Sequence, residues 1–95
     1  MSIQMINIGF GNSVATARVV AVARADSSPV KRLMDHAAEE HRLVDATSGR
    51  KTRSVLVLDS NHVVLSHQNP STIRDKLIGR TPATADDEET QETLA

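Results

Sequence analysis

Residues 54–66 read SVLVLDSNHVVLS, and this stretch decides the fold. Two apolar runs flank the turn residues Asp59-Ser60-Asn61, which predicts a β-hairpin with strands at Ser54–Leu58 and His62–Ser66. The first run is apolar on both faces, whereas a half-exposed antiparallel strand alternates. Both of its faces therefore need cover. In so short a chain the pattern favours a second subunit; the alternative is that the chain's own helices cover the sheet unaided.

Two further strands are predicted before this hairpin. The first spans residues 3–8 and ends at a GFGN turn, residues 9–12. The second runs from about 14 to 24, and Arg18 interrupts its otherwise apolar or small side chains. The GFG motif resembles the start of a dinucleotide-binding loop, but position 14 is valine and no helix follows. A tight connection between two strands is the favoured interpretation.

A first helix is predicted to begin at Asp26-Ser27-Ser28-Pro29, with Ser28 as its cap and Pro29 at the first helical position. It should end near Glu40–Arg42, because apolar or amphipathic side chains form one stripe at helical spacing: Val30, Leu33, Met34, Ala37, Ala38 and His41.

The rest of the chain supplies a short strand at Leu43, a turn at Thr47-Ser48-Gly49, and a second helix at about Thr72–Leu77 that ends at Gly79. Together these elements predict an α+β fold, with a small antiparallel or mixed sheet and two helices.

Charge divides the chain into two parts. Residues 1–80 hold all 11 Lys and Arg against seven acids, a net charge of +4, whereas residues 81–95 hold five acids and no base. We therefore expect one basic domain, residues 1–80, and an acidic, disordered tail, residues 81–95. A basic domain raises the expectation of an anionic partner.

Several classes of site are not expected. The chain has no cysteine, which removes thiolate nucleophiles, disulfides and thiolate metal sites. His36 and His41, like His62 and His67, are spaced wrongly to share a metal, so each histidine is interpreted as a surface or interface residue. We predict no catalytic residue, metal, cofactor or small-molecule substrate. With no apolar run of about 20 residues and no signal-peptide pattern, we expect a cytoplasmic protein that does not enter membranes.

The strongest polar signal is GRKTR at residues 49–53. Arg50, Lys51 and Arg53 follow a turn and precede a buried strand, and Arg18 is a further cation in need of an exposed face or a ligand. These cations favour contact with nucleic acid, while Lys31-Arg32 is better explained as solvated surface. Since Phe10 is the only aromatic residue, base stacking is not available, and duplex DNA is the better partner.

Two other functions remain open. A protein–protein scaffold would use the same cations to bind an acidic partner. A small enzyme or ligand-binding ring would need Asp45 or Asp59 beside a histidine, and nothing in the sequence places those groups together.

Five segments carry a resemblance to a known family: residues 6–12, Arg18, and residues 28–32, 45–53 and 59–66. In order and spacing they resemble the RemA family, bacterial regulators of extracellular-matrix and biofilm genes. The resemblance covers about residues 1–80. It implies a non-enzymatic, DNA-binding transcriptional regulator that assembles into a ring-like homo-oligomer.

The resemblance also implies DNA contacts at Arg18, Arg50 and Lys51, whereas Arg53 joins them on chemical grounds only. Lys51 stands where the better-known members are expected to have arginine, which keeps the charge but loses the bidentate fork. The acidic tail lies outside the resemblance.

Overall fold

The computed structural model describes residues 3–79. Its elements follow in the order β1 (Met5–Gly9), β2 (Asn12–Ala15), the 3₁₀ turn η1 (Thr16–Arg18), β3 (Val19–Arg24), α1 (Ser28–Glu39), β4 (Leu43–Asp45), β5 (Ser54–Leu58), β6 (Val63–Ser66) and α2 (Pro70–Leu77). The predicted α+β class is confirmed.

The centre of the molecule is a mixed four-stranded sheet with the order β3-β5-β6-β4. β5 pairs antiparallel with both of its neighbours, and β4 pairs parallel with β6. The β5–β6 hairpin predicted from residues 54–66 is confirmed, with Ser54 opposite Ser66 and Val57 opposite Val63. β1 and β2 form a separate antiparallel hairpin.

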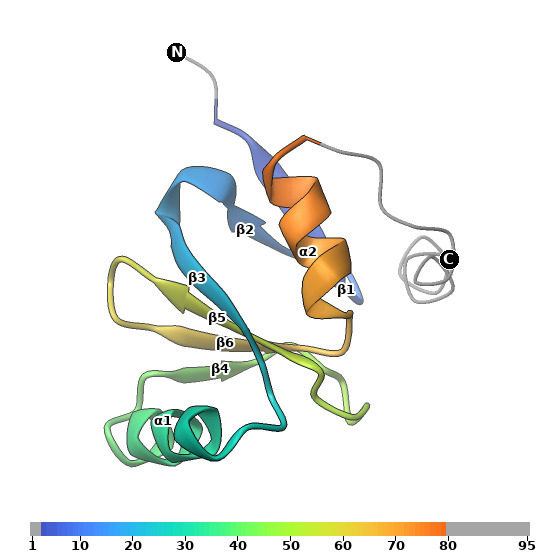
Figure 1. Cartoon of the computed structure of the whole chain (residues 1–95). Helices are drawn as coiled ribbons and strands as arrows, with labels where there is room; N and C mark the ends of the chain where they lie inside the picture. The colour runs from blue at the N-terminus through green and yellow to red at the C-terminus, as the bar shows by residue number, and fades with distance from the viewer. Residues whose placement is uncertain (1–2, 80–95) are drawn as a thin grey trace.

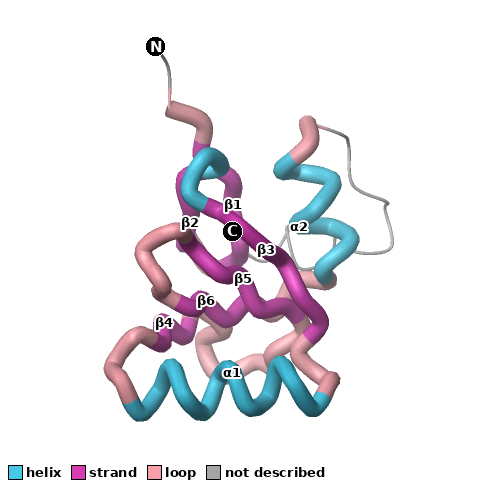
Figure 2. Tube along the Cα trace, turned by 60° about the vertical axis from the view of Figure 1, so that its left-hand side comes forward, coloured by secondary structure: helices cyan, strands magenta, loops and turns pink. Residues whose placement is uncertain are grey.

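The central sheet lies between two layers (Figures 1 and 2). On one face, α1 covers a cluster that includes Val55, Val63 and Ala37. On the other, the β1–β2 hairpin and α2 cover a second cluster, in which Leu56 packs with Ile8 and Ile73. Both apolar faces of β5 are therefore covered within one chain. The sequence argument that β5 needs a second subunit to cover one of its faces is wrong. The β1–β2 hairpin, which was not predicted to pack there, covers that face together with α2.

The single strand predicted over residues 14–24 is also wrong. The chain leaves β2 at Ala15, makes the 3₁₀ turn η1 and enters the central sheet as β3. Thr16 fixes the departure, since its backbone N–H and its hydroxyl both donate to the carbonyl oxygen of Gln4, at 2.8 and 3.0 Å. Arg18 is therefore the last residue of a helical turn and does not lie in mid-strand.

The remaining boundaries differ by one or two residues. Ser27 rather than Ser28 occupies the cap position of α1, Pro29 is its second residue, and the helix ends at Glu39. α2 begins at Pro70, because proline is favoured in a first turn where no N–H is needed. The first strand is Met5–Gly9 instead of 3–8, and β6 begins at Val63 instead of His62. The predicted tail, residues 81–95, lies outside the described residues.

Candidate nucleic-acid interface

The predicted basic motif lies on the loop that connects β4 to β5, residues 46–53 (the basic loop). Its first half is a tight turn. Oδ1 of Asp45 accepts hydrogen bonds from the backbone N–H and the hydroxyl of Thr47, at 2.9 and 2.6 Å, and these bonds lower the pKa of Asp45. Ser48 and Gly49 both have positive φ, and the N–H of Arg50 donates to Thr47 O at 2.9 Å, as in a type I′ turn. The turn predicted at Thr47–Gly49 is confirmed.

The second half of the basic loop is held by the central sheet. The N–H of Arg53 donates to Ser66 O at 2.9 Å, and Arg53 O accepts from the N–H of Ala25 at 3.1 Å. Arg53 therefore extends the ladder on both sides of β5, while Arg50, Lys51 and Arg53 are all exposed residues. The backbone is fixed where the cations leave it.

Beneath the basic loop lies the tip of the β1–β2 hairpin. The ring of Phe10 packs against the ring of His67, with 4.5 Å between their centroids, and the Arg50 guanidinium carbon lies 5.8 Å from the Phe10 centroid. That distance is within the range of a cation–π contact. Arg50, Lys51, Arg53 and His67 line a small cavity of about 90 Å³.

His67 is only 1% exposed, so its assignment as a surface or interface residue is wrong. His36, His41 and His62 are exposed, as expected. The sequence held one indirect signal for His67: the glycine at position 9. A Cβ there would lie 2.3 Å from Cε1 of His67, and Gly9 has φ +117°, so only glycine fits.

A set of buried and half-buried hydrogen bonds joins the elements beneath the basic loop. The Ser66 hydroxyl donates to Ile8 O at 2.7 Å, which joins β6 to the β1–β2 hairpin. Lys76 of α2 donates to Asn7 O at 3.0 Å and to Oε1 of Gln68 at 3.1 Å. Hydrogen bonds in a low-dielectric interior hold their groups firmly. The basic loop thus rests on three elements that are bonded to one another.

Arg18 lies elsewhere. Its Nη1 donates to Oδ2 of Asp59 at 3.1 Å, beside the β5–β6 turn. Arg53 precedes β5 and Asp59 follows it, so about 20 Å of strand separates the basic loop from Arg18. The structure brings Arg50, Lys51 and Arg53 together but places Arg18 at the opposite end of β5.

A further cation, missed in the sequence, does join the basic loop. Arg24 ends β3 opposite Ser54, the residue next to Arg53. Together with Lys51 and Arg53 it lines a polar concavity of about 320 Å³ whose other walls include Asp26, Asn69 and Pro70. No local pattern marks Arg24, because it reaches the basic loop only through the β3–β5 register.

The carboxylates proposed for an enzyme have other roles, since Asp45 stabilises the turn and Asp59 pairs with Arg18. Within residues 3–79, no group of three or more His, Asp or Glu side chains could hold a metal ion. In the same part of the chain, neither helix is long and apolar enough to cross a membrane.

Comparison with known proteins places this arrangement in a family. The family described as extracellular matrix regulatory protein A-like, or RemA-like, matches residues 5–77, which hold all the helices and strands of the described part of the chain. The chain belongs to the RemA-like family. The resemblance carried by the motifs at 6–12, 45–53 and 59–66 is therefore confirmed.

Relatives from several bacteria agree. A protein of Fervidobacterium nodosum is 54% identical over 74 residues, which cover 78% of this chain and 80% of the relative. One from Dictyoglomus turgidum is 53% identical over 76 residues, covering 80% and 89%. One from Geobacillus sp. is 48% identical over 79 residues, covering 83% and 91%. Their names describe them only as regulatory proteins, which supports a regulatory role.

Proposed function

We propose that this RemA-like protein is a DNA-binding transcriptional regulator whose basic loop binds the phosphates of duplex DNA. The observation that carries the proposal is the placement of Arg50, Lys51 and Arg53 on a loop fixed at both ends. A fixed loop loses little side-chain and backbone freedom on binding, so more of the charge attraction appears as affinity. Such a site needs no catalytic group, cofactor or small-molecule substrate.

Duplex DNA suits this surface better than single strands. Proteins that bind single strands stack bases on exposed aromatic rings. Phe10, the only aromatic residue, already packs against His67 and lies beneath Arg50. The basic loop therefore offers phosphate contacts without a stacking platform, and phosphate contacts position a protein on a duplex without reading its sequence.

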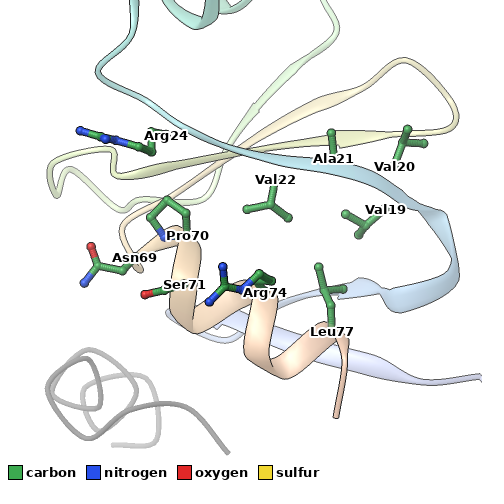
Figure 3. Close-up of a pocket in the computed structure, with 10 residues that line it drawn as sticks. All are labelled: Val19, Val20, Ala21, Val22, Arg24, Asn69, Pro70, Ser71, Arg74 and Leu77. Carbon is green, nitrogen blue, oxygen red and sulfur yellow. The ribbon is translucent and has the colours of Figure 1, made fainter. Parts of the chain in front are cut away.

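The regulator acts as a homo-oligomer, and the family resemblance implies a ring. Support for self-association comes from β3, which is a terminal strand of the central sheet. Its Val20 is 67% exposed, and a groove of about 740 Å³ runs between β3 and α2, with Val19, Val22 and Leu77 among its lining residues (Figure 3). An unpaired edge with exposed apolar side chains is a template for another chain. Repetition of one weak basic patch then multiplies affinity.

Arg18 is proposed as a separate phosphate contact on each subunit. Its ion pair with Asp59 is 69% and 44% exposed, and exposed pairs of this kind contribute only about 0.2–1 kcal/mol. A phosphate can therefore displace the carboxylate. The family resemblance further implies control of extracellular-matrix genes in the cytoplasm of a bacterium.

The test is fluorescence anisotropy on labelled duplex DNA over a salt series, with light scattering on the same samples. We expect a complex whose log K falls linearly with log salt. A protein that ignores duplex DNA but binds an acidic polypeptide with the same salt dependence would instead be a scaffold. If the affinity for either partner stays the same as the salt concentration rises, the proposal that binding is electrostatic is refuted.

A further inference from the structure

We infer that Arg24 completes a phosphate-binding site with Lys51 and Arg53, so that the DNA interface extends from the basic loop onto the end of β3. The inference rests on the proposed DNA binding and adds a residue that neither the sequence motif nor the family resemblance indicates.

The placement of Arg24 follows from the central sheet. β3 and β5 pair antiparallel, which sets Arg24 opposite Ser54. The next backbone hydrogen bond runs from the N–H of Ala25 to the carbonyl oxygen of Arg53. Residues 24 and 53 thus lie on adjacent strands at the same end of the sheet. Figure 3 shows the Arg24 side chain leaving the end of β3 near Asn69 and Pro70.

The shape of the surface also suits an anion. Arg24, Lys51 and Arg53 line one concavity of about 320 Å³ with the start of α2. Guanidinium groups donate paired hydrogen bonds to phosphate, and the lysine adds a point charge. Among the residues within 3–79 that line the concavity, one carboxylate, that of Asp26, stands against these three cations.

Asp26 competes for Arg24. Its Oδ2 accepts a hydrogen bond from Nη2 of Arg24 at 2.7 Å, and this contact lowers the pKa of Asp26, which therefore stays ionised at neutral pH. The pair is 75% and 67% exposed, so solvent screens it and little free energy opposes its opening. A phosphate that binds Arg24 must therefore replace Asp26 as the acceptor of this hydrogen bond.

Two opposite substitutions test the inference by anisotropy on duplex DNA. For each subunit in contact, Arg24→Ala should weaken binding about fivefold and make the slope of log K against log salt shallower by about 0.9. Asp26→Asn should strengthen binding. Arg32→Ala and Asp35→Asn are the matched controls, because they make the same charge changes at exposed positions on α1, across the sheet from the β1–β2 hairpin and α2.

Arg24 also lines the β3–α2 groove, so each variant must keep the parental mass in light scattering. Arg24→Gln, which retains part of the aliphatic stem, provides a second neutral variant; Arg24→Lys should keep the parental salt slope. The inference is overturned if Arg24→Ala and Arg24→Gln bind DNA with the same affinity and salt slope as Arg32→Ala. If Arg50→Ala binds DNA more weakly in the same experiment, the proposed function still stands. If the parent itself does not bind duplex DNA, both fail.

Discussion

Replacement of Arg50 by alanine is the sharpest test of the basic loop. The side chain is exposed, and the carbon of its guanidinium group lies 5.8 Å from the centroid of the Phe10 ring. Loss of this cation–π contact should lower the free energy of unfolding by about 0.5–1 kcal/mol. The turn that carries it depends on Asp45, Thr47 and Gly49, which are unchanged. The variant should therefore fold and keep the parental oligomeric state.

The effect on DNA binding can be given a magnitude. One phosphate contact contributes about −0.9 to the slope, so a rise from 50 to 200 mM salt weakens binding roughly 3.5-fold per contact. Three loop cations, Arg50, Lys51 and Arg53, then give a loss of about 40-fold per subunit, and two give about 12-fold. Anisotropy titrations at four salt concentrations resolve this difference.

Arg32→Ala is the control, because it removes the same charge from α1, on the other side of the central sheet from the β1–β2 hairpin and α2. The reasoning is refuted if Arg50→Ala and Lys51→Ala oligomers bind duplex DNA with the parental affinity and slope.

Four further results are expected. The protein should show a mass well above 10.3 kDa in light scattering without DNA, and Val20→Asp should lower that mass while circular dichroism stays unchanged; a parental mass would exclude the β3 edge. Deletion of residues 81–95 should leave the oligomer intact and DNA affinity equal or higher, because a tethered polyanion is removed; weaker binding would contradict this. Gly9→Ala should lower the free energy of unfolding by about 2–5 kcal/mol, whereas Gly11→Ala, at positive φ with open space around it, should cost about 1–2 kcal/mol; equal costs would rule out the contact with His67. Arg18→Ala should weaken DNA binding at parental mass, and a fall in mass would instead place Arg18 at a subunit boundary.

The elements that the sequence predicted well are those in which local signals agree. The β5–β6 hairpin combines two apolar runs with a turn, and α1 combines a proline start with an apolar stripe. The break within residues 14–24 was missed because no glycine or proline marks a turn at η1, so Arg18 was interpreted as a charge within a strand. The parallel pairing of β4 with β6 depends on contacts across the fold that no local pattern records.

The same distinction applies to the candidate site. Arg50, Lys51 and Arg53 are neighbours in the sequence, so their clustering was foreseeable. Arg24 and His67 reach the basic loop only through the β3–β5 register and the close approach of Gly9. For Arg18 the prediction failed in the opposite way. The sequence marks Arg18 as an unusual charge among small residues, but it does not show that the length of β5 separates Arg18 from the basic loop.

The directions of the strands connect the proposed self-association with the proposed DNA binding. β3 and β4 are the two edges of the central sheet, and both run antiparallel to β5, so they point the same way. In a head-to-tail contact that continues the sheet, the end of β3 at Arg24 would meet the end of β4, where the neighbour's basic loop begins. Every basic loop would then lie on one rim of the assembly and every Arg18 on the other, so the phosphate proposed for Arg18 would be apart from those that the basic loops contact. An antiparallel pairing of two β3 strands would instead place the basic loop of one subunit on the same side as Arg18 of the other.

Head-to-tail contacts close into rings or extend as filaments. Of the two arrangements, only the head-to-tail one therefore gives one continuous basic rim for a duplex to follow. Val44, which is 47% exposed on β4, provides a test that separates the two arrangements. Val44→Asp should break a head-to-tail contact but should leave a β3–β3 dimer intact.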